Sequence, residues 1–188
     1  NLDQNVREST GLPDAACPDW DGYTRFPCVA TLSPGAPFDY RFRVVNTGNI
    51  ELTDYYAYDI LPYVGDTGVG EALSTTARQT DWVPVLTGPL DVVAGYPNPA
   101  GANPVIEYNL TTNPCRPELS IPVPGDTSWQ DPCDANWLTE AQVADWSKVK
   151  SFRIHMFTGG VGFKPAAEVV FSAPMRAPLS ATTSIPDD

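Results

Sequence analysis

An alternating pattern of apolar and polar residues between positions 38 and 45 constrains the fold more than any other feature of the sequence. Phe38, Tyr40, Phe42 and Val44 occupy every second position, which is the period of a β-strand with one buried face. The positions between them carry an aspartate, two arginines and a valine. We therefore predict a strand that points Phe42 and Val44 into the interior and its two arginines away from it.

A turn and a second extended run follow this strand. Asn46-Thr47-Gly48-Asn49 is rich in residue types that tolerate positive φ in a tight turn. The run from Leu52 to Leu61 is rich in Tyr, Leu and Ile, and it stops at Pro62. Two extended runs joined by a short Asn/Gly turn predict an antiparallel β-hairpin over residues 38–61.

Further short extended runs are separated by turns rich in Gly and Pro. We predict strands at Val29–Leu32, Trp82–Leu86, Leu90–Val93, Val105–Thr111, Lys150–Phe157 and Ala167–Ala173. A capping-box pattern from Thr139 to Gln142, followed by apolar positions up to Val149, predicts one short helix. Many strands with a single helix predict an all-β fold, an antiparallel β-sandwich.

The chain is expected to form one domain over residues 1–176, followed by a linker or tail at 177–188. Residues 1–27 are polar and rich in turn residues, and we assign them to an N-terminal loop region. Residues 112–138 form a proline-rich insertion, and a loop of that length is usually functional or tied down. The chain begins without a charged and then apolar leader, so we expect a processed chain or, preferably, an excised piece of a longer protein.

The four cysteines favour an oxidising compartment. Three pairings are possible, and we predict the local one, Cys17–Cys28 with Cys115–Cys133. Each bridge would close a loop of about 10 to 20 residues and stabilise the fold by about 3 kcal/mol. The alternative, a four-cysteine zinc site, needs close Cys-x-x-Cys pairs, which this sequence lacks.

The net charge of −12 argues against nucleic acid or an anionic membrane surface as a partner. It is compatible with a secreted protein and with cation binding. The sequence has no run of about 18 apolar residues, so we predict no membrane span in this chain.

Clustered carboxylates give two candidate calcium sites. One lies around Cys17 and the other along the predicted hairpin, and their members are Asp14, Asp19 and Asp21, and Asp54, Asp59 and Asp66. Carboxylate oxygens suit Ca²⁺, but the spacing of a complete calcium-binding loop is missing, and a solvated loop is the alternative. The second group could also serve as glycosidase carboxylates, although acidic residues at strand ends more often bind water or backbone amides.

Aromatic residues are the other candidates for ligand binding. Trp129 and Trp137 lie in the insertion, and Tyr55, Tyr56, Tyr58 and Tyr63 follow the predicted turn. Either group could form a platform for a sugar or a peptide, or pack as bulky strand residues. The single histidine, His155, falls within a predicted strand. No nucleophile motif accompanies it, so we expect no enzymatic activity.

Residues 31–68 also resemble a known family. The shared residues, in order, are Ser33-Pro34-Gly35, Phe38, Tyr40-Arg41, Arg43-Val44, Asn46-Thr47-Gly48-Asn49, Leu52-Thr53-Asp54, Asp59-Ile60-Leu61-Pro62 and Val64-Gly65-Asp66. This order is similar to the conserved-repeat Ig-like domain of bacterial cell-surface, wall-anchored proteins and adhesins. The resemblance implies an extracellular Ig-like β-sandwich at the bacterial surface or cell wall, with no catalytic residues.

The leading hypothesis is therefore a non-catalytic module of a surface adhesin or stalk protein. Its expected partners are neighbouring domains of a larger surface protein, with a glycan or a host or cell-surface protein as further candidates. A carbohydrate-binding module that uses the loop tryptophans and calcium is the alternative hypothesis. A secreted hydrolase ranks last, because the sequence offers no recognisable catalytic motif.

Overall fold

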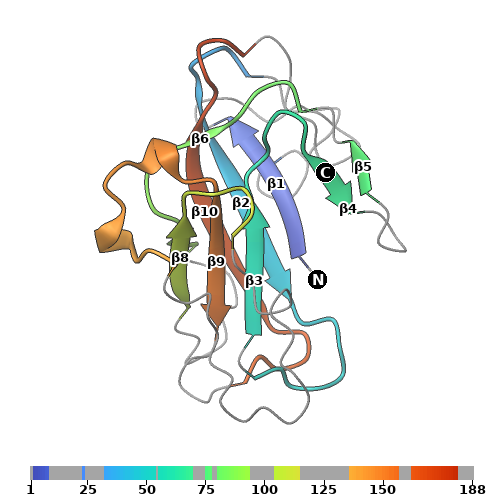
Figure 1. Cartoon of the computed structure of the whole chain (residues 1–188). Coiled ribbons are helices and arrows are strands. Elements are labelled where there is room, and N and C mark those ends of the chain that lie inside the picture. The colour runs from blue at the N-terminus through green and yellow to red at the C-terminus, as the bar shows by residue number, and fades with distance from the viewer. Residues whose placement is uncertain are drawn as a thin grey trace.

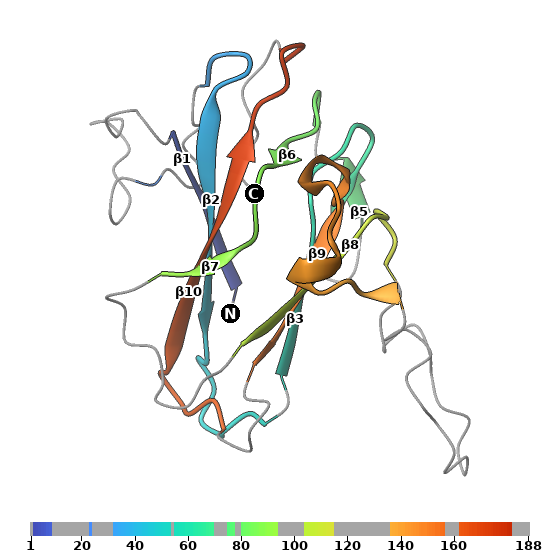
Figure 2. The same cartoon turned by 90° about the vertical axis from the view of Figure 1, so that its left-hand side faces the viewer.

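The computed structural model describes residues 2–8, 23, 32–53, 55–69, 75–77, 80–93, 104–114, 136–156 and 162–181. These residues form antiparallel β-sheets, and the two larger sheets lie in separate layers (Figure 1, Figure 2). The predicted all-β fold of the sandwich type is confirmed at this level.

The larger sheet has the strand order β1-β2-β10-β6, and β7 also pairs with β10. Its centre is the antiparallel pair of β2 (Pro37–Val45) and β10 (Glu168–Arg176), which are nine residues long each. β1 (Leu2–Glu8) pairs with the other edge of β2. The short strands β6 (Val85–Leu86) and β7 (Asp91–Val92) both pair with β10.

The second sheet has the order β3-β9-β8. β9 (Ser151–Met156) lies between β3 (Tyr55–Ile60) and β8 (Val105–Asn109), and both neighbours run antiparallel to it. A further two-stranded ladder joins β4 (Thr67–Val69) to β5 (Thr75–Ala77).

The core lies between the two larger sheets. Phe42 of β2 and Phe152 of β9 meet edge to face there, with ring centroids 4.8 Å apart. Phe42 and Val44 are each 1% exposed, so the prediction that they face the interior is confirmed. The core that joins the two sheets thus consists of aromatic and aliphatic side chains, which the strands contribute from alternate positions.

The predicted hairpin over residues 38–61 is wrong, although both of its strands exist. β2 pairs with β1 and β10, whereas β3 pairs with β9 in the other layer. The connection therefore crosses between the layers (Figure 2). None of residues 46–49 adopts the positive φ that a tight two-residue hairpin turn requires.

Asn46 explains this crossing. Its side chain is buried, and its Nδ2 donates to the carbonyl oxygens of Ile50 at 2.9 Å and Phe163 at 2.7 Å. Its Oδ1 accepts a hydrogen bond from the Gly48 backbone N–H at 3.0 Å. Leu52 and Phe163 then exchange two backbone hydrogen bonds. The connection is therefore bound to the segment that precedes β10 instead of folding back on β2.

Residues 2–8, which the sequence analysis assigns to an N-terminal loop region, form β1 instead. Tyr23 is the other described residue of that range, and its ring centroid lies 4.1 Å from the guanidinium carbon of Arg41. Arg41 is only 1% exposed. Arg41 thus lies on the strand face opposite Phe42 and Val44, as the alternation predicts, but that face is covered at this position. A cation–π contact with Tyr23 compensates part of its lost hydration.

Two separate 3₁₀ turns replace the predicted helix. They are η5 (Glu140–Gln142) and η6 (Trp146–Lys148). The Gln142 side chain does accept a hydrogen bond from the Thr139 backbone N–H at 2.8 Å, as the capping-box pattern predicts. A continuous helix does not form because the backbone of Val143 is extended. The Asp145 side chain then starts a second turn by accepting a hydrogen bond from the Ser147 N–H.

Packing continues beyond Arg176, where a linker or tail is predicted to begin. Ala177 and Ala181 are both buried and belong to the core cluster. Within the described ranges, no helix has the length and apolar character needed to cross a membrane.

Candidate functional site

The outer face of the second sheet gathers aromatic and charged side chains from three strands. In β9, the residues Phe152, Ile154 and Met156 are buried in the core, so Arg153 and His155 project from the opposite face. The strand register then sets Tyr56 beside His155, and Tyr58 and Glu107 on either side of Arg153. With Trp137, these residues form what we call the outer-face cluster: Tyr56, Tyr58, Glu107, Trp137, Arg153 and His155.

The rings of the cluster pack against one another. Tyr56 and His155 are stacked in parallel, with centroids 3.9 Å apart and planes 6° apart. The ring centroid of Tyr58 lies 6.1 Å from that of Tyr56 and 5.9 Å from that of Trp137. The guanidinium carbon of Arg153 is 4.9 Å from the Trp137 ring centroid and 5.4 Å from that of Tyr56. Arg153 therefore contacts two rings of the cluster, those of Tyr56 and Trp137.

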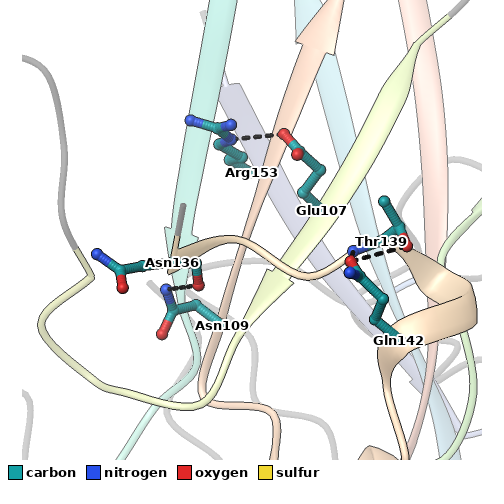
Figure 3. A network of polar contacts seen from close by, with 6 residues as sticks. All are labelled: Glu107, Asn109, Asn136, Thr139, Gln142 and Arg153. Atoms are coloured by element: carbon teal, nitrogen blue, oxygen red, sulfur yellow. Dashed lines mark hydrogen bonds and ion pairs between the residues drawn. The ribbon is translucent and has the colours of Figure 1, made fainter. Parts of the chain in front are cut away.

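A salt bridge balances the charge of Arg153. Its Nε donates to Oε2 of Glu107 at 2.7 Å, and the two side chains are 4% and 18% exposed (Figure 3). Removing one partner of such a buried pair leaves a charge without compensation and costs about 3–5 kcal/mol. Cation–π contacts of the kind made with Trp137 and Tyr56 add about 0.5–2 kcal/mol each.

The described ends of the insertion at 112–138 are attached to this sheet. Leu138 and Tyr108 exchange two backbone hydrogen bonds of 2.8 Å. Asn109 Nδ2 donates to the Asn136 carbonyl oxygen at 2.9 Å (Figure 3). On the other side, the Ser151 hydroxyl donates to the carbonyl oxygen of Thr111 at 2.9 Å. Residues 111 and 136–138 are thereby fixed to β8 and β9, while residues 115–135 lie outside the described ranges.

The aromatic residues proposed from the sequence are divided between the two faces of the sheet, and only Tyr56, Tyr58 and Trp137 come together. Trp137 is 5% exposed and belongs to the outer-face cluster. Tyr55 lies on the inner face of the same sheet, where its ring approaches Phe163 at 6.5 Å and burial raises the pKa of its hydroxyl. Trp129 lies outside the described residues. The structure thus separates Trp137 from Tyr55 by the thickness of the sheet.

Of the six predicted calcium ligands, the structure describes Asp59 and Asp66. Asp66 accepts a hydrogen bond from the Tyr63 backbone N–H at 3.2 Å, in a turn where Gly65 has a φ of 85°. Asp59 is buried in β3. The remaining predicted metal and disulfide residues fall outside the described ranges: Asp14, Asp19, Asp21, Asp54, Cys17, Cys28, Cys115 and Cys133. Among the described residues, no three His, Cys, Asp or Glu side chains form a group that could hold a metal ion.

The sequence singles out Trp137, Tyr56 and Tyr58 as candidate platform residues, but not Arg153 and Glu107, which lie among them. The alternation of Phe152, Ile154 and Met156 with Arg153 and His155 signals that β9 has two different faces. It does not reveal that Tyr56 and Glu107 flank that outer face, because cross-strand neighbours depend on register between distant segments. The assembled cluster is a network of stacked rings and one ion pair, suited to holding the sheet and the insertion together.

Comparison with known proteins finds no matching family model, no matching curated protein and no matching solved structure.

Proposed function

We propose that this chain is a non-catalytic Ig-like module of an extracellular bacterial surface protein, an adhesin or stalk, which presents the 112–138 insertion to a partner. One observation carries the proposal: the described ends of the insertion are tied to β8 and β9, with Trp137 held by Arg153. Loops positioned by a rigid β-scaffold are the usual carriers of binding function in such folds.

The residues that carry the family resemblance support a structural role. Gly35 has a φ of 77° in the turn closed by the Ala36 N–H and the Ser33 carbonyl oxygen. Asn46 fastens the crossing between the sheets, and Asp66 caps the turn that follows β3. The motif is therefore used for turns and for the link between layers. A sequence signature that encodes a fold in this way is expected of a repeated surface module.

Surface labelling tests the location. An antibody raised against the purified chain is applied to intact and to lysed cells of the producing bacterium, with a cytoplasmic protein as the control antigen. We expect intact cells to be labelled and external protease to remove the label. Labelling that appears only after lysis would refute an extracellular module.

Replacement of residues 115–135 by a Gly/Ser segment of equal length tests presentation. Beads coated with the chain should adhere to the surface colonised by the producing cells, and beads coated with the variant should not. Thermal melting of the two proteins controls for loss of the fold. Equal adhesion of both bead types would contradict a role for the insertion.

A further inference from the structure

A pocket of about 410 Å³ lies away from the outer-face cluster, where β6 of the first sheet contacts η6 of the connection to β9. Figure 2 shows β6 beside the orange segment that contains this turn. Thr87 and Arg176 line the pocket from the first sheet, and Asp145, Trp146 and Ser147 line it from the turn. The pocket is shallow and open to solvent, and its volume is at the low end of the range of about 300–1,000 Å³ for small-molecule sites.

The side chains of the turn are held in place by local contacts. Asp145 Oδ1 accepts hydrogen bonds from the Ser147 backbone N–H at 2.9 Å and from its hydroxyl at 2.6 Å. The Trp146 ring meets the Tyr108 ring edge to face at 4.8 Å, so the indole is anchored to the core. Preorganised side chains lose little entropy when a ligand binds.

Three residues that line the pocket carry polar groups that can bind a ligand. Within the described part of the chain, Oδ2 of Asp145, the indole N–H of Trp146 and the guanidinium of Arg176 take part in no hydrogen bond or ion pair. The hydrogen bonds from Ser147 hold the pKa of Asp145 below its usual range, so the carboxylate is an ionised acceptor. The pocket thus combines one acceptor and two donors with an aromatic ring.

We propose that this pocket binds one neutral pyranose unit of a glycan. A sugar hydroxyl both donates and accepts, so one ring can bind Asp145 and Arg176 at the same time. The apolar C–H face of a pyranose suits the Trp146 indole. The charges of Asp145 and Arg176 offset each other within the pocket, so the net charge of −12 decides against an acidic sugar.

This inference adds a ligand to the proposed surface module, and it moves the carbohydrate-binding hypothesis from Trp129, Trp137 and Tyr55 to the pocket around Trp146. Its test uses the purified chain in solution. A negative result would leave the outcome of surface labelling unaffected, so the two proposals fail independently.

Isothermal titration calorimetry of the purified chain with neutral gluco-, manno-, galacto- and xylo-oligosaccharides tests the proposal, with oligogalacturonate as the acidic comparison. We expect at least one neutral series to bind and oligogalacturonate to bind more weakly. Arg176→Ala and Asp145→Asn should each weaken binding about tenfold, the usual effect of losing a charge-assisted hydrogen bond. Trp146→Phe keeps a ring against Tyr108 and should also weaken binding, because the indole N–H is lost.

Lys148→Ala is the matched control, because Lys148 is an exposed cation on the same turn that does not line the pocket. Its affinity should equal that of the unmodified chain. The proposal is overturned if no neutral oligosaccharide binds at about 10 mM, a concentration above the dissociation constants of weak but specific complexes. It is also overturned if Arg176→Ala and Asp145→Asn bind as Lys148→Ala does, or if oligogalacturonate is preferred. Arg176 is exposed, so its variant remains informative even if Trp146→Phe is unstable.

Discussion

Each of the two larger sheets contains an arginine–glutamate ion pair, and the arginine is partly exposed in the first sheet and buried in the second. In the first sheet, Arg43 of β2 makes a two-pronged contact with Glu168 of β10, with N–O distances of 2.9 and 3.0 Å, and the two side chains are 35% and 12% exposed. In the second sheet, Arg153 of β9 binds Glu107 of β8 at 2.7 Å and is 4% exposed. An arginine at an alternate strand position therefore does not by itself identify a solvent-facing side.

The difference comes from the neighbouring side chains. The rings of Tyr56 and Trp137 lie against the Arg153 guanidinium and take the place of water there. A charge pair that is shielded from water depends strongly on both partners, whereas an exposed pair is screened and worth little. The two sheets should therefore respond very differently to the same substitution.

The largest loss is expected where the sheets meet. Phe42→Ala should lower the free energy of unfolding by about 3–5 kcal/mol, as for other large core aromatics, because Phe42 is buried against Phe152. Urea denaturation measures the change. Phe152→Ala and the double variant complete a cycle, in which we expect a coupling of about 0.5–1.5 kcal/mol for the edge-to-face pair. A loss below about 1.5 kcal/mol for Phe42→Ala would mean that the two layers do not share this core.

Arg153→Ala tests the shielded ion pair. It should cost about 3–5 kcal/mol in urea denaturation, because Glu107 is left beside the cluster without its partner. The double variant Arg153→Met with Glu107→Leu is the control, since removing both charges avoids the stranded carboxylate. We expect it to recover most of the loss. If the double variant is no more stable than Arg153→Ala, the cost arises from packing and not from charge.

Tyr108→Phe tests a contact that links the sheets, because the Tyr108 hydroxyl oxygen accepts a hydrogen bond from the Leu90 backbone N–H at 2.9 Å. Leu90 directly precedes β7 of the first sheet. Losing the hydroxyl leaves this buried donor unpaired, and we expect a cost of about 1–3 kcal/mol. Urea denaturation at neutral pH measures this cost.

The same residue predicts a pH dependence. Burial raises the pKa of Tyr108 from 10.0 to about 12, so the folded chain keeps the phenolic proton in a range where the unfolded chain loses it. Its contribution to stability is complete below pH 10.0 and is lost as the pH rises to about 12. The stability of Tyr108→Phe should fall less over that interval than that of the unmodified chain. Parallel curves for the two proteins would contradict the raised pKa.

The smallest effect is expected for Arg43→Ala, the counterpart of Arg153→Ala in the first sheet. It should cost less than Arg153→Ala, and added salt should reduce the cost further, because the Arg43 side chain is 35% exposed and water can reach the site that it leaves beside Glu168. Denaturation at low and high ionic strength measures both. A loss equal to that of Arg153→Ala would remove the contrast between the sheets.

Local patterns were sufficient to predict individual strands and their buried faces. The alternation around Phe42 and the runs at 150–157 and 167–173 correspond to β2, β9 and β10. Such patterns are informative because alternate side chains of a strand must enter the same environment. Part of the candidate site was accessible in the same way, since Trp137 was singled out as a bulky residue of the insertion.

Strand partners and the burial of charged residues required the folded chain. Residues 46–49 have the composition of a hairpin turn, yet the Asn46 side chain binds Phe163, which is 117 positions away. Arg41 and Arg153 are buried only because Tyr23, Trp137 and Tyr56 arrive from distant segments. The period of a strand reports that one face is buried, but hydrogen-bond pairing and the cover of the other face depend on which remote segments come together.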